Sequence, residues 1–265
     1  MPLPTYQVFA VKYGERMGTR GQMFVHADPH DVPIPMDYFV WAAVGPEHTY
    51  VIDTGFSAAI AAKRGREIIR CPTEGLAALG IDARVVENVI VTHLHYDHVG
   101  NFDLFPAATF HLQDKEMYFA TGRHMAHRTF NAAFDLDSVL GMVREVYGGR
   151  VRFHDGDVEL SPGFSLHHIG GHTMGLQVVR LWTVRGWVVL AADASHLYAN
   201  MEDTRPFPII FNLGEMIEGY ARLRELADTP RHIVPGHDPL VMARYPAPGA
   251  ELEGIAVRLD VDPTA

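Results

Sequence analysis

Short hydrophobic runs bounded by glycine, proline or aspartate recur along most of the chain. Runs of this kind are typical of buried strands. They predict β-strands at residues 6–11, 38–44, 49–52, 89–91, 109–112, 164–169, 177–184 and 187–191. The last two are separated only by Arg185 and Gly186, a spacing that predicts a β-hairpin.

A second pattern, with hydrophobic residues three and four positions apart, predicts helices at residues 139–147, 216–226 and 73–79. Strands and helices follow one another without a strict alternation. That order favours a mixed sheet system covered by helices over a doubly wound parallel sheet. No linker-like segment interrupts the chain, so we expect one domain over residues 1–265, with a helical flap at residues 115–150.

Charge and composition exclude several classes of partner. The net charge is −10 and no Lys/Arg run is longer than two, which argues against nucleic acid and anionic membranes. No apolar segment approaches the ~18 residues of a membrane span, and the first residues do not resemble a signal peptide. The only cysteine, Cys71, rules out an internal disulfide and a thiolate metal site. We therefore expect a cytoplasmic protein.

The candidate chemistry is concentrated directly after the apolar run 89–91. There the sequence reads THLHYDH, which places His93, His95, Asp97 and His98 within six residues. Imidazole and carboxylate together suit Zn, Mn, Fe or Co. Alternation on an extended segment sends His93 and His95 to one side, while the following turn aims Asp97 and His98 elsewhere. One short segment can thus supply ligands to two adjacent metal ions.

Three later segments repeat one arrangement of a strand, small residues and then a metal-ligating side chain. His172 follows two glycines after the strand at 164–169. Asp193 follows the strand at 187–191, and His237 follows Pro235 and Gly236. Two metal ions need more ligands than the first motif carries, and these three residues are the candidates.

The motif H-x-H-x-D-H, followed by these three residues, resembles the ligand set of metallo-β-lactamase-fold hydrolases. The resemblance implies a four-layer αββα sandwich of two mixed β-sheets with helices outside. It also implies two metal sites, with Asp193 bridging the ligand groups His93/His95/His172 and Asp97/His98/His237. Asp53 matches the family's strand-end aspartate, which would orient a ligating histidine. The alternative is an aspartate that merely begins a tight Thr-Gly turn.

The resemblance is closest to the N-acyl homoserine lactonase group, through residues 192–195, 205–207 and 235–238. It implies a dinuclear hydrolase, most simply with zinc and alternatively with Fe, Mn or Co. A metal-bridging hydroxide would open a lactone ring beside Asp97, and Asp193 would relay the proton. That group carries a tyrosine three residues after the bridging aspartate, where this chain has His196. His196 can donate the same hydrogen bond, and Tyr198 is the other candidate for that role.

Two further interpretations remain open from the sequence. One is a hydrolase of another cyclic or linear carboxylic ester, such as a catabolic lactonase. The other is a non-catalytic diiron sensor that binds O₂ or NO. The partner we expect is a small lactone or ester, and a homodimer is expected by analogy alone.

Overall fold

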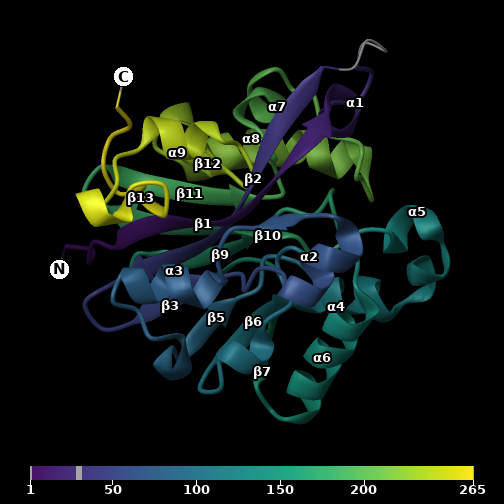
Figure 1. Ribbon diagram of the computed structural model, residues 1–265, viewed down its shortest axis with the longest axis horizontal. Coiled ribbons are helices and arrows are strands. Elements are labelled where there is room, and N and C mark those ends of the chain that lie inside the picture. Colours follow the sequence, from purple (N-terminus) through teal and green to yellow (C-terminus); the bar gives the residue numbers. More distant parts are fainter. Residues whose placement is uncertain (1, 28–31, 265) are drawn as a thin grey trace.

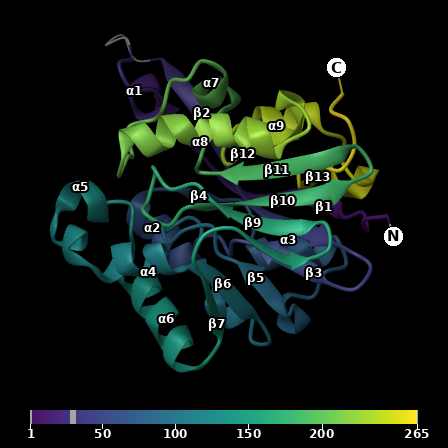
Figure 2. The same cartoon turned by 180° about the vertical axis from the view of Figure 1, so that it is seen from behind.

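The computed structural model describes residues 2–27 and 32–264. Two β-sheets pack face to face, and helices lie on the outer side of each sheet (Figures 1 and 2). This is the four-layer αββα sandwich with two mixed sheets expected from the sequence. The strands that carry the candidate ligands end along one edge of the sandwich.

The strands of the first sheet are β1 (Gln7–Thr19), β2 (Pro33–Val44), β3 (Thr49–Ile52), β4 (Glu67–Ile68), β5 (Asn88–Ile90), β6 (Thr109–Gln113), β7 (Val151–His154) and β13 (Ala256–Arg258). Their order is β13-β1-β2-β3-β5-β6-β7, with β4 paired to β1. The pairs from β3 to β7 are parallel and the others antiparallel, so the sheet is mixed.

The second sheet contains β8 (Val158–Ser161), β9 (Phe164–His168), β10 (Gln177–Thr183), β11 (Gly186–Ala192) and β12 (Ile233–Pro235). Its order is β12-β11-β10-β9-β8. Strands β10 and β11 form the predicted hairpin, with Thr183 opposite Gly186. Strand β12 runs parallel to β11, while the remaining pairs are antiparallel.

The α-helices are α1 (Arg20–Met23), α2 (Ala58–Arg64), α3 (Pro72–Ala78), α4 (Asp114–Thr121), α5 (Arg128–Asn131), α6 (Leu136–Tyr147), α7 (Tyr198–Glu202), α8 (Leu213–Leu226) and α9 (Leu240–Arg244). Short 3₁₀ turns are η1 (Ala83–Val85), η2 (Phe102–Leu104), η3 (Arg123–Ala126), η4 (Pro230–His232) and η5 (Ala250–Leu252). The three helices predicted from hydrophobic spacing are confirmed as α6, α8 and α3. Residues 115–150 are largely helical, through α4, η3, α5 and α6.

The eight predicted strands are confirmed, but two of them are longer than expected. Strand β1 continues to Thr19 and β2 begins at Pro33, because the two pair with each other along this whole stretch. Polar residues such as Glu15 and Arg16 interrupt the apolar pattern there, so the predicted strand ended too early. The paired ends project beyond the sheet towards α1 (Figure 1).

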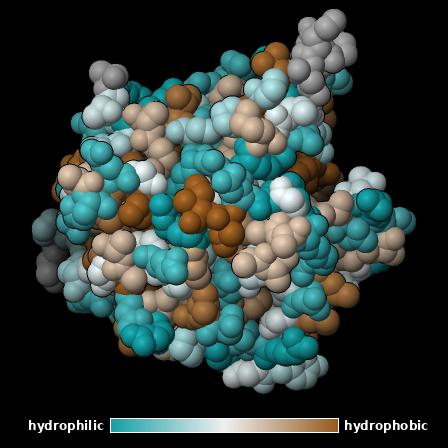
Figure 3. Space-filling view, in the orientation of Figure 1, coloured by the Kyte–Doolittle hydropathy of each residue, from teal (hydrophilic) through white to brown (hydrophobic). Residues whose placement is uncertain are grey.

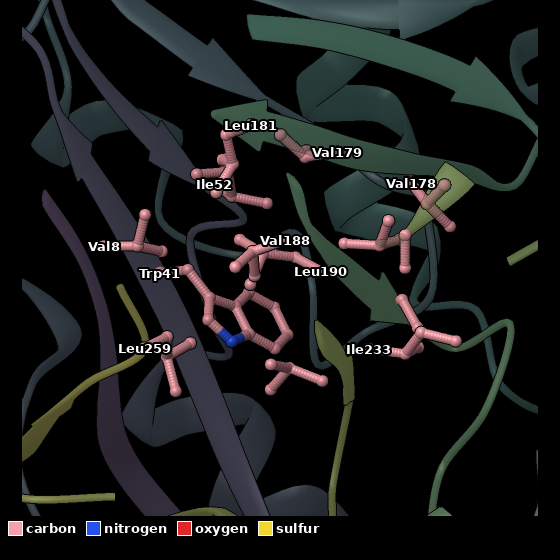
Figure 4. Close-up of a cluster of buried hydrophobic side chains, with 14 of the residues drawn as sticks. Val8, Trp41, Ile52, Val178, Val179, Leu181, Val188, Leu190, Ile233 and Leu259 are labelled. Carbon is pink, nitrogen blue, oxygen red and sulfur yellow. The ribbon is translucent and has the colours of Figure 1, made fainter. Parts of the chain in front are cut away.

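Alternation along the central strands divides the core into two layers. On β1, Val8 and Ala10 face the second sheet, while Phe9 and Val11 join the layer beneath the helices α2, α3 and α6. Trp41 of β2 lies between the sheets, among Val8 and Leu259 on one side and Val188 and Leu190 of β11 on the other (Figure 4). The two apolar layers determine how the sheets pack against each other. This packing brings the ends of their strands together at one edge.

On the face drawn in Figure 3, hydrophobic residues occur in small groups among hydrophilic ones. Within residues 2–27 and 32–264, no helix has the length and hydrophobicity needed to cross a membrane.

Candidate metal centre

The candidate ligands meet because their strands end at the same edge of the sandwich. Asp53 follows β3, and the motif of His93 follows β5, which runs parallel to β3. In the second sheet β9 and β11 are both antiparallel to β10, so they point the same way, and β12 is parallel to β11. Residues that follow β9, β11 and β12 therefore arrive together, and these residues are His172, Asp193 and His237.

The first ligand group consists of His93, His95 and His172, all buried. His95 Nδ1 lies 3.0 Å from His93 Nε2 and 2.9 Å from His172 Nε2. A ring nitrogen offers either one hydrogen or one lone pair, so three nitrogens facing one point cannot satisfy one another, whereas a cation there would. Burial lowers the pKa of His93 and of His95 well below the usual range, and neighbouring histidines add to the effect. Both rings are thus neutral, the form that binds metal.

The second group consists of Asp97, His98 and His237. His98 Nε2 and His237 Nε2 lie 3.9 and 3.7 Å from Asp97 Oδ2. Both nitrogens are buried and accept or donate no hydrogen bond within the described part of the chain. Buried polar atoms are normally paired, so these two indicate a ligand between them.

Asp193 stands between the two groups, and each of its oxygens faces one of them. Oδ2 lies 3.3 Å from His172 Nε2 and 3.7 Å from His93 Nε2. Oδ1 lies 2.9 Å from His237 Nε2 and 3.2 Å from His98 Nε2. Burial opposes ionisation of this carboxyl, but His237 and His98 outweigh burial and hold its pKa well below the usual range. Asp193 is therefore an anion placed where two cations could share it.

The donor set of these seven residues is chemically suited to divalent metal ions. The seven side chains form groups whose candidate ligand atoms all lie within 4.8 Å of one another, and every member is buried. Imidazoles and carboxylates without competing thiolates fit Zn, Mn, Fe or Co. The cluster is thus able to bind metal ions.

Contacts behind the ligands fix which ring nitrogen faces inward. His172 Nδ1 donates to the carbonyl of Ile209 at 2.7 Å, and His237 Nδ1 donates to that of Asp37 at 2.8 Å. His98 Nδ1 lies 2.7 Å from Asp53 Oδ2. Because each Nδ1 faces an acceptor, Nε2 is the ring nitrogen that points into the centre.

Asp53 does more than begin a turn. Its Oδ1 accepts from the backbone N–H of Thr92 at 2.8 Å, and its Oδ2 accepts from the Thr92 hydroxyl at 2.8 Å. Asp53 also has a positive φ of 62°, a backbone conformation that a non-glycine residue adopts only at a cost. One carboxylate thereby ties the end of β3 to the motif after β5 and to the ring of His98.

His196 lies against the centre, and Tyr198 does not. His196 Nε2 is 2.9 Å from Asp193 Oδ2, and its ring stacks on Phe207 with the ring centres 3.3 Å apart. Burial lowers the pKa of His196 to about 3, so the ring is neutral. The ring of Tyr198 instead packs beneath the guanidinium of Arg244 on α9, 4.2 Å from it. Tyr198 is not part of the cavity lining at Asp193 in this structure, and a catalytic role for it stays a prediction.

Sequence reasoning missed Glu116, in the first turn of α4. Its side chain is fully buried. Oε1 accepts from the backbone N–H of Leu94 at 2.8 Å, and Oε2 accepts from that of Gly175 at 3.0 Å. Leu94 separates His93 from His95, and Gly175 closes the loop of His172. Glu116 therefore joins the two loops of the first ligand group, although in the sequence it resembles an ordinary acidic residue near a helix N-terminus.

A cavity of about 220 Å³ borders the centre and includes His95, Asp97, Asp193 and His196 in its lining. Thr129, Ala132 and Ala133 form part of its wall, so the helical segment at 115–150 reaches the site. Pro208 and Ile209 line the cavity from the loop before α8.

Comparisons with known proteins agree with this geometry. The family model of the Metallo-beta-lactamase superfamily matches residues 34–237. The N-acyl homoserine lactonase AttM of Azorhizobium caulinodans is 28% identical to this chain, over 79% of this chain and 84% of its own length. The N-acyl homoserine lactonase AiiA of Bacillus thuringiensis subsp. kurstaki is also 28% identical, over 57% of this chain and 55% of its own length.

Solved structures with the same fold include a quorum-quenching N-acyl homoserine lactone lactonase. Its TM-score is 0.76 at 22% identity, covering 91% of this chain and 95% of that chain. The dizinc quorum-quenching lactonase AidC has a TM-score of 0.68 at 19% identity, covering 90% of each chain. Since the family model spans most of the sequence and includes all seven candidate ligands, the chain belongs to the metallo-beta-lactamase superfamily.

Proposed function

We propose that this protein is a dinuclear metal-dependent hydrolase that opens lactone rings. The observation that carries the proposal is Asp193, whose two oxygens face two separate groups of buried ligand atoms. Relatives that align with most of the chain are named N-acyl homoserine lactonases, which makes these lactones the first substrates to test.

In this proposal His93, His95 and His172 would hold one ion, Asp97, His98 and His237 would hold the other, and Asp193 would be shared by both. Asp53 keeps His98 in the binding tautomer through the 2.7 Å contact to its Nδ1. Two bound divalent ions would polarise the ester carbonyl and lower the pKa of a water molecule towards neutrality. The protein's own part is to hold the two positive ions in a buried site and to admit the ester through the adjoining cavity.

His196 would act as a neutral hydrogen-bond donor. Its pKa, lowered by burial to about 3, keeps the ring neutral at ordinary pH. Its Nε2–H donates to Asp193 Oδ2, and stacking on Phe207 holds the plane of the ring. From this position the ring would orient the Asp193 carboxylate and could donate to a substrate oxygen instead.

A second candidate function is hydrolysis of another carboxylic ester, such as a catabolic lactone. The supporting observation is His196 itself, because the lactonase group that the sequence resembles carries tyrosine at this place. The imidazole changes both the shape and the hydrogen bonding of the wall nearest Asp193.

Zinc is the proposed metal, and the dizinc lactonase AidC supports that choice. A homodimer and a cytoplasmic location complete the proposal. The homodimer rests on analogy with the lactonase group, and the cytoplasm is the default compartment for a sequence with no apolar segment of membrane-spanning length.

The test is pH-stat hydrolysis by the zinc-reconstituted protein against short and long acyl homoserine lactones, simple lactones and aryl esters. We expect lactone hydrolysis with kcat/KM of about 10⁴ M⁻¹s⁻¹ or above for the preferred substrate. Asp193→Asn and His172→Ala should lose bound metal and activity together, as measured by elemental analysis. Retention of both metals by these variants, or no lactone hydrolysis by the loaded wild type, would overturn the proposal.

His196→Ala and His196→Tyr test the role of the imidazole. Loss of a positioned hydrogen-bonding group should lower turnover of His196→Ala by roughly 10- to 10³-fold while metal content stays the same. Higher turnover of acyl homoserine lactones by His196→Tyr would favour that substrate group. Unchanged turnover of His196→Ala would show that the ring has no part in the reaction.

A further inference from the structure

Three arginines line the cavity beside the candidate metal centre. Arg16 lies on β1, Arg64 ends α2, and Arg66 stands between α2 and β4. The chain as a whole has 22 Lys and Arg residues against 32 Asp and Glu residues, a net charge of −10. A cationic cluster in this one cavity therefore runs against the overall charge of the protein.

The guanidinium groups are held in place by neutral contacts. Arg66 Nε donates to the Tyr96 hydroxyl at 2.9 Å, and the guanidinium of Arg64 lies 4.0 Å from the centre of the Tyr96 ring. Arg64 also donates to the backbone carbonyls of Ala132 and Phe134. Arg16 donates through Nη1 to Gln22 Oε1 at 3.0 Å. The positions of the three positive charges are thus fixed before any ligand arrives.

These charges lack the ion pairs that neutralise their neighbours. Next to Arg64, Lys63 pairs with Asp135 at 2.6 Å, and on β1 Lys12 pairs with Asp37 at 2.9 Å. Within the ranges 2–27 and 32–264, neither Arg64 nor Arg66 nor Arg16 has a carboxylate within ion-pair distance.

The carboxylates in the cavity lining are those of Asp97 and Asp193. Both are candidate metal ligands, so their charge is engaged by the ions in the proposed function. No carboxylate in the lining is therefore left to balance the positive charge of the three arginines. Arginine is also the side chain best shaped to bind a carboxylate through two parallel hydrogen bonds.

The size of the cavity restricts the substrate further. At about 220 Å³ it is smaller than the roughly 300–1,000 Å³ typical of sites for larger organic ligands. The lining also contains apolar residues, among them Met36, Ala133 and Ile209. A compact ring with one charged substituent matches this combination better than a long neutral acyl chain.

We propose that the substrate is a compact lactone bearing a carboxylate, and that Arg16, Arg64 and Arg66 bind this carboxylate while the ester lies at the metal ligands. This inference rests on the proposed function, because it places the scissile ester beside Asp193. It goes further in naming the charge and size of the substrate and the residues that select it.

The experiment compares 5-oxotetrahydrofuran-2-carboxylate with its primary carboxamide, which has the same ring and nearly the same size but no charge. γ-Butyrolactone, N-hexanoyl homoserine lactone and a ring with a longer carboxylate arm complete the panel. Hydrolysis by the zinc-loaded full chain is followed at low and high salt. We expect a carboxylate-bearing lactone to be preferred over its neutral partner by about 10- to 100-fold in kcat/KM, the range of a charge-assisted hydrogen bond. The preference should shrink as salt screens the arginines.

Arg16→Gln and Arg66→Gln should each remove most of this preference. Arg84→Gln is the matched control, since Arg84 is exposed and pairs with Asp82 at 2.8 Å, away from the cavity. Titration calorimetry with tetrahydrofuran-2-carboxylate, which cannot be hydrolysed, should show weaker binding to the two cavity variants than to wild type and Arg84→Gln.

The outcomes separate the two proposals. No hydrolysis of any lactone overturns the proposed function. Hydrolysis of neutral lactones at equal or higher rates, with no salt dependence and no effect of the arginine variants, overturns the carboxylate proposal and leaves lactone hydrolysis standing.

Discussion

Individual side chains around the candidate centre act mainly by fixing loops. Glu116 contributes no candidate ligand atom, yet its two oxygens hold Leu94 and Gly175, one in each loop of the first ligand group. Asp53 ties the end of β3 to the motif after β5, through the backbone of Thr92 and the ring of His98. The ring nitrogens converge because buried carboxylates behind them satisfy the backbone of the loops that carry them.

Glu116→Gln should loosen the first ligand group. An amide has a single acceptor oxygen, so one of the two buried N–H groups would face an NH₂ donor and lose its partner, at about 1–3 kcal/mol. We expect a lower melting temperature and weaker zinc retention against a chelator. The measurements are calorimetry and metal analysis.

Glu74→Gln is the matched control for this change. Glu74 also lies in the first turn of a helix and accepts one backbone N–H bond, from Cys71, but it is exposed. If Glu116→Gln kept zinc and stability as well as Glu74→Gln does, Glu116 would have no positioning role.

Among the elements, α8 is seated directly on the loop of His172. The backbone N–H groups of Phe211 and Asn212 donate to the carbonyl of Gly171 at 2.9 and 2.8 Å, and Asn212 caps the helix by accepting from Gly214 and Glu215. Gly171 has a φ of +80°, and a Cβ there would lie 2.5 Å from the backbone nitrogen of Met216. The start of α8 therefore sets the position of the ligand that follows Gly171.

Gly171→Ala should displace this loop from α8. Its cost has two parts, a left-handed backbone at about 1–2 kcal/mol and a clash with helix backbone that cannot move aside. Gly149→Ala isolates the first part, because Gly149 has a φ of +71° and no atom within 4 Å of the added Cβ. The free energy of unfolding from chemical denaturation and the zinc content should both fall further in Gly171→Ala than in Gly149→Ala. Equal losses in the two variants would mean that the contact with α8 is unimportant.

At the scale of the whole molecule, stability depends on histidines buried away from the candidate centre. His111 of β6 contacts Asn88 of β5 at 3.1 Å through Nε2, and His154 of β7 at 3.0 Å through Nδ1. Burial, with help from His154, lowers the pKa of His111 to about 3. The ring is thus neutral in the folded sheet, where it links three parallel strands.

This shift predicts that acid weakens the fold. In the unfolded chain the pKa of histidine is about 6.5, so between that value and about 3 the unfolded state binds the extra proton. The contribution of His111 to stability is complete above pH ~6.5 and is lost as the pH falls towards 3. Urea unfolding at several pH values, at equal metal loading, should show a shallower pH dependence for His111→Gln than for wild type. Parallel curves would contradict this assignment.

Eight of the strands, the family and the candidate ligands could be predicted from the sequence. Apolar runs mark strands because a strand must bury its side chains, and the local spacing in THLHYDH brings four ligand-grade groups together whatever surrounds them. The three later ligands could be found because each follows a strand, and strand ends meet at the edge of a sheet. Strands and the ligands that follow them can be predicted in this way because both depend only on residues close together in the sequence.

The residues that surround those ligands could not be predicted without the three-dimensional fold. Glu116 and the three cavity arginines come from α4, β1, α2 and the turn between α2 and β4, and no short-range spacing relates them to THLHYDH. His196 and Tyr198 are two positions apart, and Tyr198 was the alternative to His196, yet the fold aims His196 at Asp193 and packs Tyr198 under Arg244. Contacts between distant segments depend on how the two sheets pack, and that packing follows from the whole hydrophobic core and not from any single motif.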